Sequence, residues 1–206
     1  MKAYTLIHIL FAAASFTVGA LPFGKWISSL VAHVDITKRG SGNIGAANVA
    51  RELGIQWGIM TLTLDLIKGF VPVFIIGRVF PDWHLGPVLL GLCALTGHQF
   101  SVFLGFKGGK GVATALGVYL ALAPFQALVG LCFFVVIVVL SDFVSLGSIL
   151  SAWSLPILFV IAGKPALWVS ASALMAGLIS FRHKDNIRRL MRGEERRWRK
   201  RKWPGA

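Results

Sequence analysis

The chain has 206 residues, of which 56% are hydrophobic and only 14% are charged, and its mean hydropathy is +0.74. This composition excludes an ordinary soluble domain and predicts an all-α integral membrane protein. The formal net charge of +13 is concentrated near one end, because eleven of the 21 Lys and Arg residues lie between Arg182 and Lys202. A basic segment beside a membrane favours contact with anionic lipid, and without an accompanying nucleic-acid fold we expect no nucleic-acid partner.

Apolar runs follow along the chain at roughly 4–31, 54–77, 85–104, 112–140, 145–162 and 165–181. A membrane-spanning helix needs about 20 such residues. The first run continues through "LPFGKWISSLVA", too far for a cleaved signal peptide, so we expect one helix there. Pro124 lies near the middle of the long fourth run and predicts two short helices rather than one kinked helix. The expected fold is therefore a bundle of seven membrane-spanning helices, not six.

Charge predicts the orientation of this bundle. With seven helices, the basic loops around Lys38 and Lys107 lie on the same side of the membrane as the basic tail. The positive-inside rule then puts the N-terminus outside and the C-terminus in the cytoplasm. We expect residues 1–182 to form a transmembrane domain and residues 183–206 to form a basic cytoplasmic tail.

This topology brings three polar stretches to one face: "RGSGNIGAANVAR" (39–51), "GHQFSVFLGFKGGKGVAT" (97–114) and "FRHKDNIRRLMRGEE" (181–195). In the first stretch, Ser41 is expected to cap a short helix whose N-terminal N–H groups bind an anion. Asn48 and Arg51 share a face of that helix. In the third stretch, His183 and Asn186 have the same i, i+3 spacing.

The glycines of the second stretch allow backbone conformations that other residues avoid. We expect the N–H groups of Gly108, Gly109 and Gly111 to form a nest for a phosphate group, with added charge from Lys107 and Lys110. The loop is not a nucleotide-binding P-loop, because its glycine spacing is one residue short and Gly111 stands where the magnesium-binding hydroxyl belongs.

Structural roles compete with these functional ones. Glycines in membrane helices often serve close packing, and loop lysines often only set the topology. His98 and His183 lack partners at metal-ligand spacing, so we expect no metal site and no cofactor. Asp65 and Lys68 in "LDLIKG" are ionisable residues inside a membrane span, spaced to pair on one helix face. Such a pair is either functional or a brace of the bundle.

Taken together, the three stretches resemble the signature motifs of the bacterial acyl-phosphate:glycerol-3-phosphate acyltransferases, the PlsY family. The resemblance also includes "GALPFG", "LDLIKG" and "VSLGS" (144–148). It implies an inner-membrane enzyme that transfers an acyl group from acyl phosphate to the 1-hydroxyl of glycerol 3-phosphate at the cytoplasmic face, working as a monomer among membrane lipids. The resemblance implies catalytic roles for Ser41, Arg51, Lys110, His183 and Asn186. It implies substrate-binding roles for Asn43, Asn48 and Ser148, and a phosphate-binding loop shaped by Gly108, Gly109 and Gly111. We also expect His98, Lys107 and Ser145 to bind substrate.

Ala47 stands where the family usually has Thr, which removes a hydroxyl from the first motif. The alternative function is an anion or phosphate transporter, since cationic loops and broken helices also suit transport. Transport predicts charges along a path through the bilayer, whereas here only Asp65 and Lys68 lie deep. A basic-tailed membrane scaffold would explain the tail but not the loops.

Overall fold

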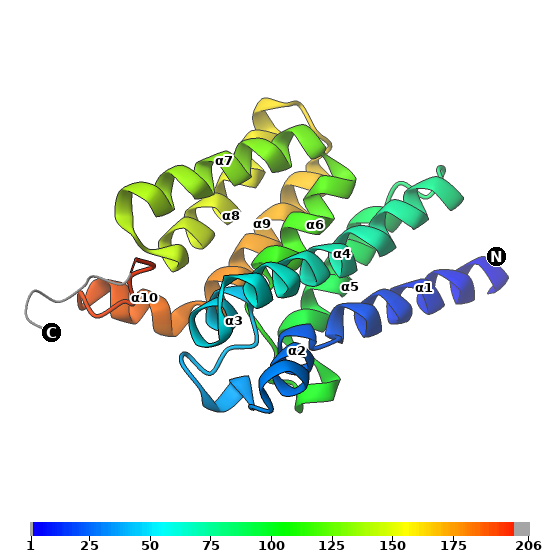
Figure 1. Ribbon diagram of the computed structural model, residues 1–206. Coiled ribbons are helices and arrows are strands. Elements are labelled where there is room, and N and C mark those ends of the chain that lie inside the picture. The colour runs from blue at the N-terminus through cyan, green and yellow to red at the C-terminus, as the bar shows by residue number, and fades with distance from the viewer. Residues whose placement is uncertain (1, 200–206) are drawn as a thin grey trace, which may run out of the picture. The chain divides into compact units, whose positions relative to one another are not determined.

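The computed structural model describes residues 2–199, and the regular elements within that range are all helices (Figure 1). The chain forms two compact units, Met1–Ala127 and Leu128–Ala206. The first unit contains α1 (Lys2–Ala20), α2 (Phe23–Ala32), η1 (Ile36–Lys38), α3 (Ala46–Leu53), α4 (Ile55–Val79), α5 (Gly86–Gln99), η2 (Val102–Leu104) and α6 (Val112–Leu122). The helix α7 (Pro124–Ser141) crosses the boundary, and the second unit continues with α8 (Val144–Ile161), α9 (Ala166–Arg182) and α10 (Lys184–Met191).

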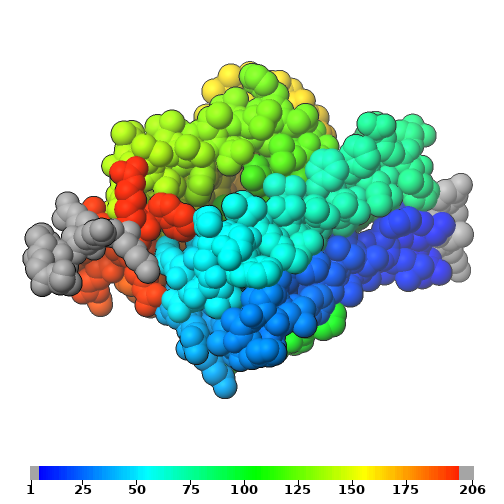
Figure 2. Space-filling model, in the orientation of Figure 1, coloured from blue at the N-terminus to red at the C-terminus, as the bar shows by residue number. Residues whose placement is uncertain are grey.

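In the first unit, α4 packs against α6 and α1 packs against α5, while α1 and α4 run side by side (Figure 2). Glycines allow the close approach of α4 and α6. A Cβ atom at Gly69 would overlap the carbonyl of Thr114, and one at Gly117 would overlap the carbonyl of Leu66. Small residues at such crossings let helix backbones meet, which is how helices associate where no hydrophobic effect drives them together.

The two ends of the first unit differ in chemistry. At one end, the His8 ring stacks on Trp83 with 3.8 Å between ring centroids, and Phe11 meets Phe80 edge to face. Aromatic rings of this kind are typical of a membrane–water interface. At the other end lie the loops that carry the first two polar stretches.

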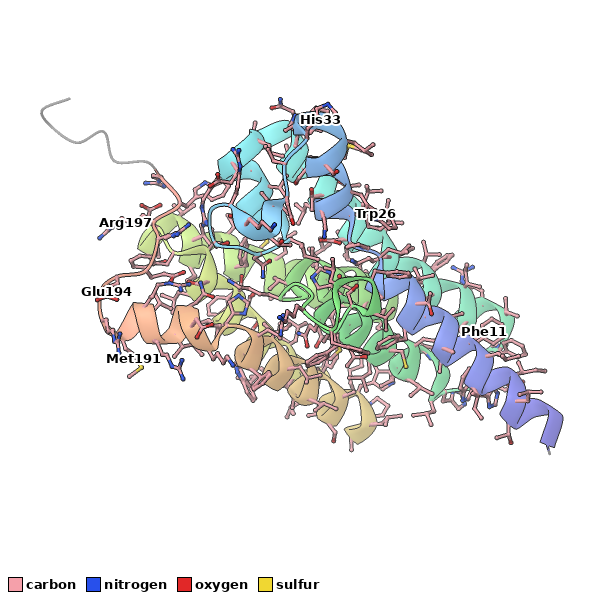
Figure 3. All side chains as sticks on the ribbon, turned by 90° about the horizontal axis from the view of Figure 1, so that it is seen from below. Phe11, Trp26, His33, Met191, Glu194 and Arg197 are labelled. Atoms are coloured by element: carbon pink, nitrogen blue, oxygen red, sulfur yellow. The ribbon has the colours of Figure 1, made fainter. Side chains whose placement is uncertain are left out.

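In the second unit, α8 packs against α9, and α10 contacts both. The chain leaves α10 past Met191 and Glu194 toward Arg197 (Figure 3). It then returns to the turn between α7 and α8, where Asp142 accepts hydrogen bonds from the backbone N–H groups of Trp198 and Arg199. The described part of the basic tail is thus attached to this turn, while residues 200–206 of the predicted tail lie outside the described residues.

Among residues 2–199, five segments are long and apolar enough to cross a membrane: Thr5–Ala32, Ile55–Val79, Gly86–Leu104, Pro124–Ser141 and Val144–Ile161. Two shorter apolar helices, Val112–Leu122 and Ala166–Arg182, accompany them. Large apolar side chains on these segments are exposed, among them Leu140 at 81%. Trp26, at 43%, projects from α2 (Figure 3). So much exposed apolar surface fits lipid contact.

The division of the fourth apolar run is confirmed, because α6 ends at Leu122 and α7 begins at Pro124. The expectation of one continuous helix over 4–31 is wrong. The helix α1 ends at Ala20 and α2 begins at Phe23, with Pro22 at the break. Proline lacks the N–H that would continue the helical hydrogen bonds, and it disfavours helical geometry in the residue before it.

Candidate functional site

The first polar stretch forms a loop that Asn48 holds together from α3. The Asn48 side chain is only 2% exposed. Its Oδ1 accepts a hydrogen bond from the N–H of Ser41 at 2.9 Å, and its Nδ2 donates to the carbonyls of Asn43 at 2.9 Å and Arg39 at 3.1 Å. Asn43 in turn accepts from the N–H of Gly45 at 2.8 Å. The Asn48 amide therefore shapes the loop, and Ser41 is exposed on its surface.

Ser41 does not cap the helix, contrary to the expectation from the sequence. The N-cap of α3 is Gly45, and Ser41 lies four residues earlier, in the loop ahead of the helix. The loop needs Gly40 and Gly42 at positive φ, so the chain turns before the helix can begin. Arg51 follows on α3 and is half-buried, as expected for a residue that shares the helix with Asn48.

The glycine loop of the second stretch folds back on the end of α5. The N–H groups of Phe106, Gly108 and Gly109 donate to the carbonyls of Ser101, Gln99 and His98 at 2.8, 3.2 and 3.0 Å, respectively. A Cβ atom at Gly108 would overlap the His98 carbonyl, and one at Gly109 would overlap the His98 ring.

The expected phosphate nest is therefore wrong for Gly108 and Gly109. Their N–H groups bind α5, and these glycines serve the close approach of two chain segments. Gly111, at φ +84°, is the N-cap of α6, so the first N–H groups and the positive dipole end of that helix lie beside Lys110. What the loop offers for the expected anion site is a helix N-terminus with an adjacent lysine.

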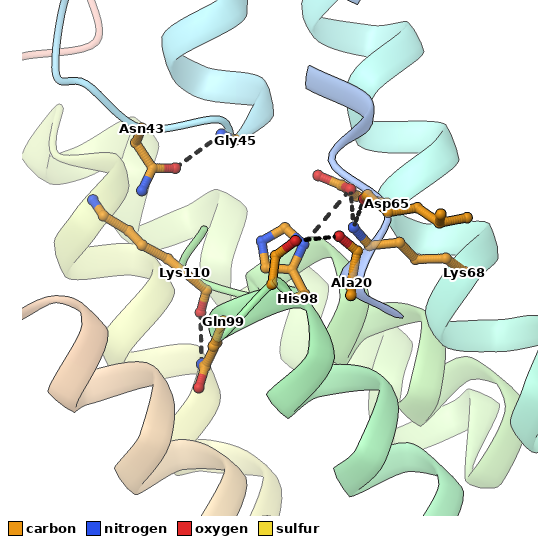
Figure 4. A network of polar contacts seen from close by, with 10 residues as sticks. Ala20, Asn43, Gly45, Asp65, Lys68, His98, Gln99 and Lys110 are labelled. Carbon is orange, nitrogen blue, oxygen red and sulfur yellow. Dashed lines mark hydrogen bonds and ion pairs between the residues drawn. The ribbon is translucent and has the colours of Figure 1, made fainter. Parts of the chain in front are cut away.

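The two lysines of the loop differ in burial. Lys107 is exposed, whereas Lys110 is half-buried and its side chain points toward Asn43 of the first loop (Figure 4). Gln99, which is fully buried, donates from Nε2 to the Lys110 carbonyl at 2.9 Å and fixes the backbone there. Sequence reasoning missed Gln99, although it directly follows His98 in the second stretch.

The first two stretches lie against each other. Ile36 of η1, Ile44 of the first loop and Val49 of α3 form a small buried cluster. Leu104, from η2 in the second stretch, packs on this cluster. The predicted convergence of these two stretches is thus observed in the first unit.

In the second unit, His183 lies at the junction of α9 and α10 and is 2% exposed. Its Nδ1 is 2.8 Å from the Ile179 carbonyl, which can only accept, so Nδ1 carries a proton. In the neutral ring, Nε2 is then the unprotonated nitrogen. The first turn of α8 carries the buried Ser145 and Ser148, and the Ser148 hydroxyl donates to the Val144 carbonyl at 2.8 Å.

In the second unit, Glu195 connects Ser145, Asn186 and Arg189 through hydrogen bonds. Sequence reasoning did not identify Glu195 as a site residue. Its Oε1 accepts from Asn186 Nδ2 at 2.6 Å and from the Ser145 hydroxyl at 2.8 Å, and its Oε2 accepts from Arg189 Nε at 2.8 Å. Burial opposes the charge of this carboxylate, but the three hydrogen bonds outweigh it and hold the pKa of Glu195 below its ordinary value. The sequence offered one weak signal for Glu195, which is that it is the second of two acidic residues after Gly193 in an otherwise basic segment.

Helices long and apolar enough to cross a bilayer, joined by loops with half-buried cations and a helix N-terminus, define a multi-pass membrane protein. The family model for glycerol-3-phosphate acyltransferase matches residues 9–193. Curated glycerol-3-phosphate acyltransferases are 43% identical over 188 residues in Geotalea daltonii, covering 91% of this chain and 96% of that protein, and 42% identical over 194 residues in Geobacter sulfurreducens, covering 94% and 98%.

Two crystal structures of PlsY, an integral membrane glycerol 3-phosphate acyltransferase, are also similar. The glycerol 3-phosphate form superposes with a TM-score of 0.89 and the lysophosphatidic acid form with 0.87; each is 38% identical and covers 92% of this chain and 94% of that one. The chain belongs to the glycerol-3-phosphate acyltransferase family. It is a multi-pass membrane enzyme that acylates glycerol 3-phosphate.

Proposed function

We propose that the acyl donor is acyl phosphate and that the products are lysophosphatidic acid, acylated at the 1-hydroxyl, and inorganic phosphate. The observation that carries this proposal is the glycine loop, which sets the half-buried Lys110 beside the N-terminus of α6. A compact anion such as the phosphate of an acyl phosphate is the kind of group that a helix N-terminus and a lysine bind together. Membership of an acyltransferase family favours this function over a phosphate transporter.

In the proposed reaction, the 1-hydroxyl oxygen of glycerol 3-phosphate attacks the acyl carbonyl carbon. An ester bond forms, the bond between the acyl carbon and the phosphate oxygen breaks, and phosphate leaves. Because acyl phosphate is a mixed anhydride, its leaving group needs charge stabilisation more than a covalent enzyme nucleophile. We assign that role to Lys110. The hydroxyl proton passes to the phosphate of the acceptor, so no side chain needs to act as a strong base.

The remaining residues receive roles that fit their surroundings. Ser41 contacts substrate phosphate from the first loop, and Arg51 contacts it from α3. Asn48 shapes the loop, in which Asn43 faces Lys110. The glycine loop is shaped by Gly108, Gly109 and Gly111. His98 supports the loop from the end of α5, and Lys107 attracts anions from its exposed position. In the second unit, His183 and Asn186 bind glycerol 3-phosphate, and Ser145 and Ser148 belong to the same group of substrate-binding residues. No metal ion or cofactor takes part.

We also propose that seven helices cross a bacterial inner membrane, that the enzyme is monomeric, and that residues 1–182 form the catalytic domain ahead of the basic tail. The N-terminus lies outside, and the reaction takes place at the cytoplasmic face. In a cysteine-free background, single cysteines at positions 40, 107 and 190 should react with an impermeant thiol reagent from the cytoplasmic side only, and one at position 82 from the outside only. Labelling of positions 40 and 107 from opposite sides would refute this topology.

The donor is tested with purified enzyme, glycerol 3-phosphate and either palmitoyl phosphate or palmitoyl-CoA. We expect phosphate release with the former, no product with the latter, and full activity in EDTA. Lys107 and Lys110 provide a matched pair in one loop. Lys110→Ala should lower kcat by about 10²-fold or more, in the range that loss of one charge-stabilising group usually causes, whereas Lys107→Ala should change kcat by less than about threefold. Equal effects of the two substitutions would remove the basis of the assignment.

A further inference from the structure

Two ionisable side chains lie in the middle of α4, in a segment apolar enough to cross a membrane. Asp65 and Lys68 are each 2% exposed, and Lys68 Nζ lies 2.7 Å from Asp65 Oδ1. Removing two charges from water costs several kcal/mol for each ion, and their mutual attraction often fails to offset it. Because of this cost, an ionisable pair inside a membrane helix is expected either to stabilise the bundle or to take part in function.

Lys68 acts as a brace. Its Nζ donates to the Leu21 carbonyl at 2.8 Å, and it lies 5.5 Å from the centre of the Phe23 ring. These residues flank Pro22, where the break between α1 and α2 leaves carbonyls without their helical donors. The Ser101 hydroxyl likewise donates a hydrogen bond to the neighbouring carbonyl of Ala20, at 2.5 Å. The break is thus held from α4 and from the chain just after α5.

Asp65 makes a second contact that a brace between α4 and the α1–α2 break does not need. Its Oδ1 lies 3.7 Å from Nδ1 of His98, in the last turn of α5 (Figure 4). This distance is too long for a hydrogen bond, but between groups that are both buried it is a substantial electrostatic contact. It favours a proton on Nδ1 and orients the imidazole ring.

His98 joins this pair to the glycine loop. Its ring lies directly against Gly109, where a Cβ atom would overlap Nε2, and its carbonyl accepts the N–H of Gly109 at 3.0 Å. The next residue along the chain is Lys110. A continuous series of contacts therefore runs from Lys68 through Asp65 and His98 to the backbone that carries Lys110.

We propose that Asp65 is a positioning residue for acyl transfer, which sets the orientation of the His98 ring and thereby the position of Gly109 and Lys110. The inference rests on the proposed role of Lys110. Asp65 touches no substrate and acts only through His98, while Lys68 compensates its charge and ties the pair to the α1–α2 break. Displacement of a catalytic group by about 1 Å can cost about 10²-fold in rate, so a small rotation of the His98 ring matters.

The test compares variants that keep or remove the contact between Asp65 and His98. In His98→Asn the amide nitrogen takes the position of Nδ1 and still donates toward Asp65, whereas His98→Leu removes this group. We expect His98→Leu to lower kcat/KM for palmitoyl phosphate by roughly 10- to 100-fold with little change in the KM for glycerol 3-phosphate, and His98→Asn to retain most of the activity.

Asp65→Leu/Lys68→Met removes both charges together, so neither is left buried without its partner. This double variant should show the same selective loss for palmitoyl phosphate. Adding His98→Leu to it should cause little further loss, because residues that act through one another are not additive. Folding is checked by size-exclusion chromatography and thermal unfolding in detergent. If the double variant does not fold, the comparison of His98→Asn with His98→Leu decides the question alone.

Two results would overturn the proposal. One is a folded Asp65→Leu/Lys68→Met enzyme with wild-type kcat/KM for palmitoyl phosphate, and the other is equal activity of His98→Asn and His98→Leu. Lys110→Ala separates this inference from the proposed function. If Lys110→Ala retains wild-type kinetics, the proposed role of the glycine loop in stabilising the leaving phosphate is wrong. If Lys110→Ala is impaired while the Asp65 and His98 variants are normal, only the positioning role is wrong.

Discussion

Glu195 offers the sharpest test of how the second unit is held together. Its side chain is 5% exposed and accepts hydrogen bonds from Ser145, Asn186 and Arg189. A hydrogen bond to a charged group contributes about 1.5–3 kcal/mol. The Arg189 partner is 37% exposed, so solvent screening reduces that contribution to about 0–1 kcal/mol. The two buried hydrogen bonds and the screened one together make Glu195→Ala lower the free energy of unfolding by about 3–7 kcal/mol.

For a chain of this size, about 1 kcal/mol corresponds to a shift of about 2–4 °C in melting temperature. We expect Glu195→Ala to unfold about 6–28 °C below the wild type, measured in detergent by intrinsic tryptophan fluorescence. Glu194→Ala is the matched control, because Glu194 is exposed and next in sequence, and it should change the melting temperature by less than about 2 °C. A Glu195→Ala melting temperature within 2 °C of that of the Glu194→Ala control would refute the argument.

The pH dependence of unfolding should report the same carboxylate, because its folded-state pKa lies below its ordinary value of 4.5. Its stabilisation is complete above that value and is lost as the pH falls through the lower folded-state pKa, so the gap in melting temperature between wild type and Glu195→Gln should narrow in acid. Gly109→Ala should lower kcat/KM for palmitoyl phosphate at least tenfold, because the added methyl overlaps the His98 ring. Gly105→Ala, with open space around its Cβ, should cost only about 1 kcal/mol of backbone strain and leave the kinetics unchanged, and equal kinetics for the two variants would contradict this reasoning. His183→Ala should mainly raise the KM for glycerol 3-phosphate, whereas a kcat lower by about 10³-fold at unchanged KM would identify a general base instead.

Local signals predicted much of the fold. A proline without an N–H divides an apolar run wherever it falls, which is why Pro124 separated α6 from α7. The same rule applied to Pro22 would have divided the first apolar run. We expected one helix there because apolar residues continue on both sides of Pro22. Residues three apart on a helix share a face, so the pairing of Asp65 with Lys68 was also readable.

The partners of the site residues were not readable from local pattern. The sequence suggested that Gly108 and Gly109 offer free N–H groups to a phosphate, but those groups donate to carbonyls at the end of α5, where the loop returns. It suggested that Asn48 reaches a substrate, but its amide is engaged within the first loop. Glycine permits either use, and the choice depends on which chain segment lies next to it.

By itself, the sequence determined that this is a membrane protein, that its fourth apolar run divides at Pro124, which residues carry cationic and amide chemistry, and which family its motifs resemble. These properties follow from composition, from backbone chemistry and from spacing within one helix. Only the tertiary structure decided that His98 lies between Asp65 and the glycine loop, and that Glu195 joins Asn186 to Ser145. The contacts of Asp65 with His98 and of Ser145 with Glu195 join residues 33 and 50 positions apart, and their geometry is set by the packing of whole helices rather than by any local pattern.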